Sequence, residues 1–133
     1  MRKVLFVCSE NAGRSQMAAA FFNTLAAGID IMAESAGTIP APAINPIVVA
    51  AMQEKGIDIS ANTPKLFNSD IANQYERLIS FGCLVKSTFT SGVQARIEDW
   101  DVADPKEKEL AEVREIRDSI EAKIKELCLT LQP

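Results

Sequence analysis

Residues 4–19, VLFVCSENAGRSQMAA, place a cysteine and an arginine on either side of a short turn. The apolar residues before Cys8 are typical of a buried strand, and the helix formers from Ser15 onward predict a helix. A turn between a strand and a helix can direct its backbone N–H groups inward, and the positive end of the helix dipole points to the same place. Arg14 adds a planar guanidinium that can hold a tetrahedral anion through two hydrogen bonds. The stretch therefore predicts an anion-binding loop.

Two residues inside this turn favour a tightly curved backbone. Gly13 can adopt conformations that are closed to most residues, and Asn11 tolerates left-handed geometry better than most. A cysteine at the end of a buried strand is usually only a small apolar side chain. The spacing Cys-x5-Arg-Ser between a strand and a helix is far more specific. We therefore interpret Cys8 as a thiolate nucleophile that attacks phosphate or a phosphate mimic.

Composition restricts the other kinds of function. The 133 residues are 47% hydrophobic and 24% charged, which is typical of a single globular domain spanning residues 1–133. The formal net charge is −4, so we expect no nucleic-acid partner bound through a basic surface. No apolar run reaches membrane-spanning length and no signal-peptide pattern precedes the first strand, so we expect no membrane association and a cytoplasmic location.

The numbers of cysteine and histidine residues exclude several kinds of catalytic mechanism. Three cysteines without a C-x-x-C pair make neither a disulfide framework nor a standard zinc site. The chain has no histidine, which excludes Cys-His and Ser-His mechanisms. The reaction must therefore use thiolate, carboxylate, arginine and backbone groups.

Strand-like and helix-like segments alternate along the chain. Strands are expected at residues 3–7, 29–35, 77–81 and 95–100, and helices at residues 15–26, 45–55, 69–75 and 105–129. For the last helix, Asp104 is the expected N-cap and Pro105 the expected first residue. The alternation predicts an α/β fold, a three-layer α/β/α sandwich around a four-stranded parallel sheet. The anion-binding loop then lies at the carboxyl end of the first strand, where such sheets bind ligands.

The segment CSENAGRSQMA at residues 8–18 resembles the anion-binding loop of the low-molecular-weight protein tyrosine phosphatases, and more closely that of the arsenate reductases that share their fold. The resemblance continues through ESAGT at 34–38, GIDIS at 56–60, EDWDVADP at 98–105 and VREIRDSI at 113–120. It implies a low-molecular-weight phosphatase-like (flavodoxin-like) fold and an arsenate or phosphate ligand. The residues implied to bind this oxyanion are Ser9, Glu10, Asn11, Ala12, Gly13 and Arg14.

Two polar side chains have candidate roles beside the nucleophile. The family uses the aspartate of an Asp-Pro pair on a late loop as its general acid, and Asp104 with Pro105 matches this pair. An N-cap role for Asp104 is the alternative, and the two roles are compatible. The hydroxyl of Ser15 could donate to the Cys8 sulfur and stabilise the thiolate, although a helix cap would have the same sequence pattern.

In the resembled reductases a second cysteine attacks the first sulfur, releases arsenite and leaves a disulfide for thioredoxin, glutaredoxin with glutathione, or another thiol donor. RLISFGC at residues 77–83 resembles this region, but Gly82 stands at the usual position and Cys83 follows one residue later. Residues 84–92 contain no further cysteine. Cys128 is the alternative resolving thiol, although we interpret it as a packed side chain near the end of the last helix.

Some reductases of this family also bind potassium, through a glutamate on the first helix and an aspartate after the second. Ala19 and Lys65 stand at these positions here, so we expect no metal site, and no other cofactor is implied.

The leading hypothesis is therefore arsenate reduction by a monomer. The alternatives are a small phosphatase that hydrolyses phosphate monoesters, and an oxyanion-binding or redox-sensing module without turnover. Residues 104–110, DPKEKEL, lack the aromatic residues that the phosphatases use to hold an aryl substrate, which favours the reductase.

Overall fold

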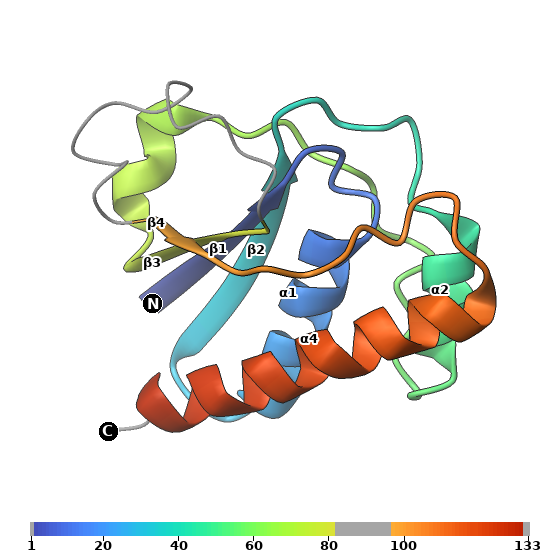
Figure 1. Cartoon of the computed structure of the whole chain (residues 1–133). Coiled ribbons are helices and arrows are strands. Elements are labelled where there is room, and N and C mark those ends of the chain that lie inside the picture. The colour runs from blue at the N-terminus through green and yellow to red at the C-terminus, as the bar shows by residue number, and fades with distance from the viewer. Residues whose placement is uncertain (1, 82–96, 132–133) are drawn as a thin grey trace.

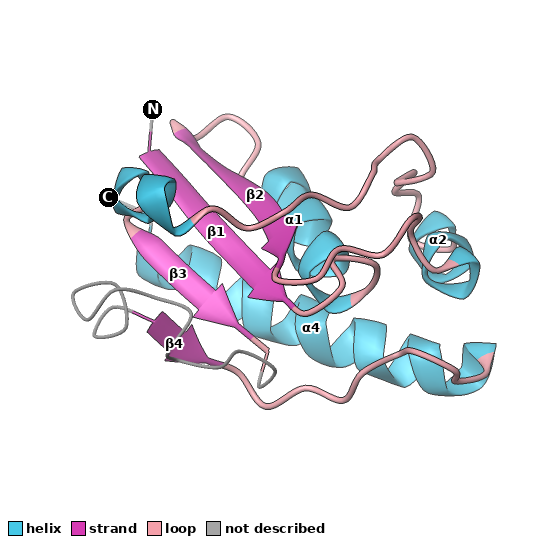
Figure 2. Ribbon diagram, turned by 90° about the horizontal axis from the view of Figure 1, so that it is seen from above, coloured by secondary structure: helices cyan, strands magenta, loops and turns pink. Residues whose placement is uncertain are grey.

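The computed structural model of the chain describes residues 2–81 and 97–131. Within these residues one sheet is formed by β1 (Arg2–Cys8), β2 (Ile31–Gly37), β3 (Arg77–Ser80) and β4 (Ile97–Asp99). All neighbouring strands are parallel, and their spatial order is β2-β1-β3-β4 (Figure 2). The predicted four-stranded parallel sheet is therefore confirmed. For β1, β2 and β3 the bounds lie within two residues of those predicted, while residues 95 and 96 of the fourth predicted strand lie outside the described residues.

The helices form the outer layers of the sandwich. Those in the described part of the chain are α1 (Arg14–Leu25), α2 (Pro46–Gln53), the 3-10 helix η1 (Ser69–Gln74) and α4 (Leu110–Leu131). Helices α1 and α4 cover one face of the sheet and α2 packs beside α4, whereas η1 and the segment before it lie on the other face (Figure 1). None of the helices in the described ranges has the length and apolar character of a membrane-crossing segment.

The central strand β1 is buried on both faces. Val4 and Phe6 belong to the larger core, which they share with α1 and α4. Leu5 and Val7 belong to a smaller cluster that includes Phe67, Ala72 and Tyr75. Successive side chains of a strand point to opposite faces, so a strand with a helix layer on each side is apolar throughout. This explains why the run at residues 3–7 does not alternate.

The start of the last helix differs from the prediction. Helix α4 begins at Leu110 and not at Pro105, so Asp104 is not its N-cap. Instead, Asp104 Oδ1 accepts a hydrogen bond of 3.0 Å from the Lys106 backbone N–H, which forms a tight Asx turn. Glu107 then has a positive φ of 63°, which is incompatible with a right-handed helix. Asp104 therefore lies on a loop of its own, separated from α4 by five residues.

Helices α2 and α4 are joined by a buried arginine. Arg117 donates from Nη1 to the Ala51 carbonyl oxygen at 3.0 Å and to Glu54 Oε1 at 2.7 Å. Hydrogen bonds from Arg114 and Arg117 lower the pKa of Glu54 to about 2. Asn45 caps α2, because its side-chain oxygen accepts from the Ile47 N–H at 2.9 Å. These contacts fix α2 and the segment before it, which forms one side of the site described below.

Stability is expected to depend on the α4 face that contacts the core. Ile120 is completely buried, and Ile120→Ala should lower the free energy of unfolding by about 2–5 kcal/mol because it leaves a cavity. Leu129 lies on the same helix but is 72% exposed, so Leu129→Ala should change it by less than about 0.5 kcal/mol. Urea unfolding of both variants measures the difference. Equal losses for the two variants would contradict the packing of α4.

Candidate active site

The loop between β1 and α1 is held by the segment that follows β2. The carbonyl oxygens of Ser9, Glu10 and Ala12 accept hydrogen bonds from the N–H groups of Ile39, Ala41 and Asn45, at 2.7, 2.9 and 3.0 Å. The C=O and N–H groups of a trans peptide point in opposite directions. The N–H groups of Glu10, Asn11 and Gly13 are therefore turned to the inner side of the loop. Such inward N–H groups are the backbone geometry that the predicted anion-binding loop requires.

The side chain of Asn11 stabilises this loop from the protein interior. Its side chain is completely buried, and its φ of 52° is the left-handed conformation that asparagine tolerates. Its Nδ2 donates to Ser15 Oγ at 2.7 Å, and its Oδ1 accepts from the Lys65 N–H at 2.9 Å and from Gln16 Nε2 at 3.0 Å. Asn11 therefore contributes its backbone to the anion loop, while its side chain fixes the curvature of the loop.

The sulfur of Cys8 lies among hydrogen-bond donors at the end of β1. The Ser15 hydroxyl is 2.9 Å from Cys8 Sγ, and the Asn11 N–H donates to the same sulfur at 3.3 Å. Because Asn11 Nδ2 already donates to Ser15 Oγ, the hydroxyl proton of Ser15 remains for the sulfur. Ser15 is the second residue of α1, whose N-cap is Gly13. This geometry supports the interpretation of Ser15 as a donor that stabilises the thiolate.

Arg14 is fixed by backbone oxygens from two other strand ends. Its Nη1 donates to the carbonyl oxygens of Phe81 at 2.8 Å and Val102 at 3.0 Å, and its side chain is almost completely buried. Its Nη2 lies 3.6 Å from Asp104 Oδ2, an ion pair in which the aspartate is 49% exposed. The guanidinium is thus oriented before any ligand arrives.

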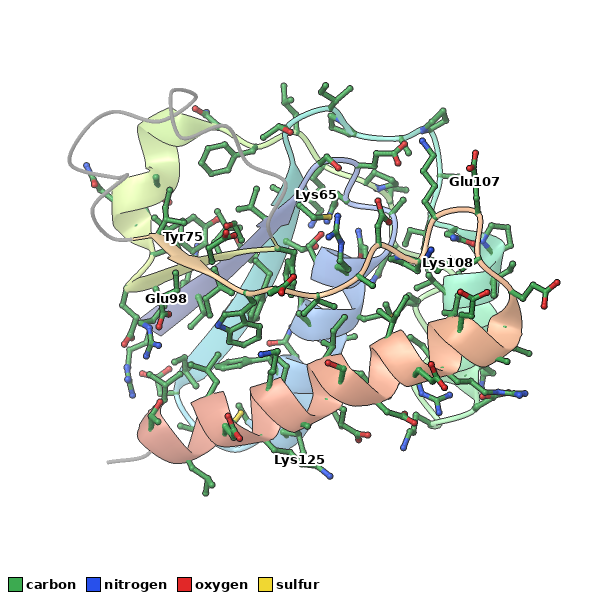
Figure 3. All side chains as sticks on the ribbon, viewed as in Figure 1. Lys65, Tyr75, Glu98, Glu107, Lys108 and Lys125 are labelled. Atoms are coloured by element: carbon green, nitrogen blue, oxygen red, sulfur yellow. The ribbon has the colours of Figure 1, made fainter. Side chains whose placement is uncertain are left out.

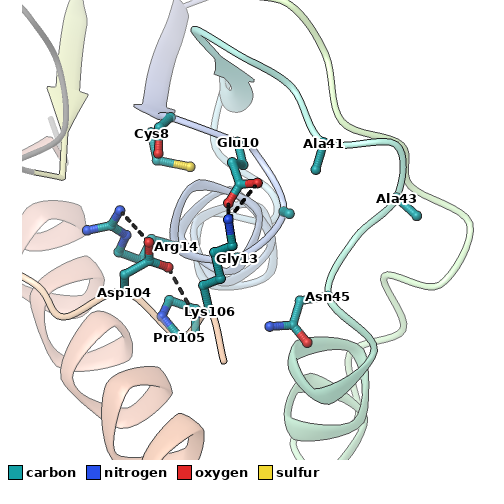
Figure 4. Close-up of a pocket in the computed structure, with 12 residues that line it drawn as sticks. Cys8, Glu10, Gly13, Arg14, Ala41, Ala43, Asn45, Asp104, Pro105 and Lys106 are labelled. Carbon is teal, nitrogen blue, oxygen red and sulfur yellow. Dashed lines mark hydrogen bonds and ion pairs between the residues drawn. The ribbon is translucent and has the colours of Figure 1, made fainter. Parts of the chain in front are cut away.

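Cys8, Arg14 and Asp104 line one cavity of about 200 Å³ (Figure 4). The anion loop forms its base, Ala41, Ala43 and Asn45 form one side, and residues 104–106 form another. Among the residues that the structure describes, those lining the cavity are small, polar or charged, and none is aromatic. The site brings together four of the five predicted catalytic residues around or behind this cavity, since Ser15 contacts the sulfur from the interior. The fifth, Cys83, lies outside the described residues.

Cys128 lies at the opposite end of the molecule from Cys8. The last turn of α4 contacts the start of β1, because Arg2 Nη1 donates to the Leu131 carbonyl oxygen at 3.3 Å. Cys8 ends the same strand, and a seven-residue strand is roughly 20 Å long. Burial also raises the pKa of the Cys128 thiol. Cys128 is therefore a packed thiol that cannot reach Cys8 in this structure.

Two glycines permit close contacts at the site. A Cβ on Gly13 would lie 2.6 Å from Pro105 Cγ, so its absence lets the Asp104 loop rest on the anion loop. A Cβ on Gly37 would lie 2.8 Å from the Ser9 carbonyl oxygen and 2.9 Å from the Asn11 nitrogen. Gly13 is among the residues predicted to bind the oxyanion, whereas the role of Gly37 was not predicted, although its motif ESAGT is part of the resemblance.

Two further contacts at the site were not foreseen. Lys106 Nζ lies 3.3 Å from Glu10 Oε2 across the cavity, and no spacing in the sequence signals a pair so far apart. Lys65 contributes its backbone N–H to Asn11. Within the described residues no cluster of histidine, cysteine and carboxylate side chains could hold a metal ion.

Comparison with known proteins agrees with the observed fold. Residues 3–133 match the family of low molecular weight phosphotyrosine protein phosphatases, and the chain belongs to this family. It is 37% identical over 128 residues to the glutaredoxin arsenate reductase of Synechocystis sp., covering 96% of each chain.

Solved structures of arsenate reductases are also similar. One in the phosphate binding state gives a TM-score of 0.83 at 34% identity, over 99% of this chain and 100% of that one. The thioredoxin-dependent arsenate reductase of Corynebacterium glutamicum gives 0.80 at 32% identity, over 98% of this chain and 61% of that one. The resemblance to the arsenate reductases of this family is therefore confirmed, and the chain is an enzyme of this kind.

Removal of the Ser15 hydroxyl should slow reactions of the Cys8 sulfur. In Ser15→Ala the thiolate loses one hydrogen bond, so alkylation of Cys8 by iodoacetamide at pH 7 should slow by about 2- to 10-fold. The rate is read from the mass of the Cys8 peptide. Ser9→Ala is the matched control, because Ser9 contacts the neighbouring segment through its backbone oxygen. An unchanged rate in Ser15→Ala would show that the hydroxyl does not act on the sulfur.

Gly37→Ala should damage both stability and ligand binding. The new methyl group meets backbone atoms of the anion loop, so we expect a loss of about 1–3 kcal/mol in unfolding free energy together with weaker phosphate binding. Gly28→Ala is the control, because Gly28 has a φ of 89° but no atom within 4 Å of the added Cβ. It should lose about 1 kcal/mol through backbone strain and keep its phosphate affinity. Calorimetric titration with phosphate measures the affinity of both variants and so distinguishes Gly37→Ala from Gly28→Ala.

Proposed function

We propose that the chain reduces arsenate to arsenite through a covalent intermediate on Cys8. The observation that carries this proposal is the Cys8 sulfur with two donors beside it, in a small cavity that also holds Arg14. Similarity to named arsenate reductases supports the choice of substrate.

In the first step the Cys8 thiolate attacks arsenic, and an S–As bond forms as one As–O bond breaks. Arg14 and the inward N–H groups of Glu10, Asn11 and Gly13 hold the remaining oxygens. Asp104 lies 3.6 Å from Arg14 and is half exposed, so it can donate a proton to the departing oxygen, which leaves as water, and regain one from solvent.

In the second step another thiolate attacks the Cys8 sulfur. The electron pair of the S–As bond goes to arsenic, which is reduced from As(V) to As(III), and a disulfide forms. We assign this thiol to Cys83. Cys83 follows Phe81 by two residues, and the Phe81 carbonyl oxygen accepts from Arg14 in the site. Cys128 is a poor candidate for this role, because it lies near the start of β1 whereas Cys8 lies at the end of that strand.

An external thiol system then reduces the disulfide. The names of two relatives support either glutaredoxin with glutathione or thioredoxin in this role. Both operate in a reducing compartment, which agrees with a cytoplasmic location. We further propose that the chain works as a monomer with one domain.

The second candidate is hydrolysis of phosphate monoesters, which the family name favours. The same cysteine would form a cysteinyl-phosphate that water resolves. The cavity gives this hypothesis less support, because the described residues that line it include no aromatic side chain to hold an aryl group.

Disulfide mapping after exposure to arsenate tests the proposal. The reduced chain is mixed with arsenate, quenched with acid and analysed as non-reduced peptides by mass spectrometry. We expect a Cys8–Cys83 bridge that requires arsenate and is absent from Cys8→Ser.

The control variant is Cys128→Ser, which should keep the bridge because Cys128 lies at the other end of β1. A bridge from Cys8 to Cys128 would overturn the assignment of the resolving thiol. Hydrolysis of p-nitrophenyl phosphate without any disulfide or arsenite would favour the phosphatase instead.

A further inference from the structure

An ion pair crosses the mouth of the cavity. Lys106 Nζ lies 3.3 Å from Oε2 and 3.4 Å from Oε1 of Glu10, and both side chains line the cavity (Figure 4). Glu10 comes from the anion loop and Lys106 from the loop of Asp104, 96 positions further along the chain. We call Glu10 and Lys106 the rim pair.

Glu10 is an unusual residue for the rim of an anion site. Its carboxylate would repel an incoming oxyanion, because like charges a few ångströms apart oppose each other even in a partly solvated site. Lys106 cancels this charge. The rim pair therefore has no net charge, whereas removal of either partner changes the charge at the mouth by one unit in a known direction.

The turn that carries Lys106 is held in place independently of Glu10. The Lys106 N–H donates to Asp104 Oδ1, and Pro105 packs against Gly13, where any larger residue would collide with it. Glu107, the next residue, has a φ of 63°, a conformation that persists where surrounding contacts determine it. Figure 3 shows Glu107 and Lys108 on this loop before α4. The ammonium group is thus presented at the mouth by a fixed backbone.

We propose that Lys106 is a second cation of the oxyanion site, positioned at the cavity mouth, and that Glu10 masks its charge and so sets the affinity for the oxyanion. This inference rests on the proposed function, because it concerns the same anion. It predicts that substitution of Lys106 and substitution of Glu10 change the affinity for the oxyanion in opposite directions.

Lys106→Met keeps the aliphatic stem but leaves the Glu10 carboxylate uncompensated, so it weakens anion binding. Glu10→Gln keeps an oxygen that can accept from Lys106 but removes the negative charge, so it strengthens anion binding. The double variant has a neutral rim, as the wild type has, and returns close to the original affinity.

Calorimetric titration of the reduced chain with inorganic phosphate at low ionic strength tests this. We expect Lys106→Met to bind about 3- to 10-fold more weakly and Glu10→Gln about 2- to 5-fold more tightly. The double variant should lie within about twofold of wild type, and the differences should shrink as salt screens the charges. Lys108→Met is the matched control, since it removes one positive charge from the same loop outside the cavity lining, and it should change affinity less than about twofold.

Two results would overturn the proposal. If both single variants weaken phosphate binding, the pair acts by holding the loops together. If neither differs from Lys108→Met, the rim charge has no effect on the ligand. Failure of the wild type to bind phosphate would overturn the oxyanion site itself. If the variants respond as expected but arsenate produces neither arsenite nor a disulfide, the proposed reduction fails and the role of Lys106 stands.

Discussion

The side-chain amide of Asn11 connects the parts of the structure on which the site depends. Its oxygen accepts from the backbone of Lys65 and from Gln16 on α1, and its nitrogen donates to Ser15. With both ends of the amide engaged, its orientation is defined, and so is the direction of the Ser15 hydroxyl proton. The donor that reaches Cys8 is thus fixed by a buried contact that never touches the ligand.

Backbone packing adds a second constraint at the same place. Gly37 lets the end of β2 approach the anion loop closely, and Gly13 lets Pro105 rest on the other side of that loop. The anion loop therefore lies between two segments that are distant in sequence. Such a loop pays little conformational entropy when it binds a ligand, because its shape is already determined.

The parallel sheet, and the strand, turn and helix around Cys8, could be predicted from the sequence because they depend on local signals. The apolar run at residues 3–7 and the Cys-x5-Arg-Ser spacing define a strand, a turn and a helix within twenty residues. The predicted start of α4 was wrong because that prediction also relied on a local signal. Asp104 with Pro105 is a good local start signal for a helix, but the contact between Pro105 and Gly13 is made over a long separation and keeps this segment on the site.

Several contacts of the site that escaped prediction join residues far apart in the sequence. The carbonyl oxygens of Phe81 and Val102 bind Arg14, and backbone oxygens have no signature in a sequence. The kind of group that binds Arg14 nevertheless determines the charge that this side chain keeps. Carbonyl dipoles orient a guanidinium without neutralising it, and the carboxylate of Asp104 is half exposed and screened by solvent. Arg14 therefore keeps its positive charge in a buried position, which suits it to the proposed role of holding an oxyanion.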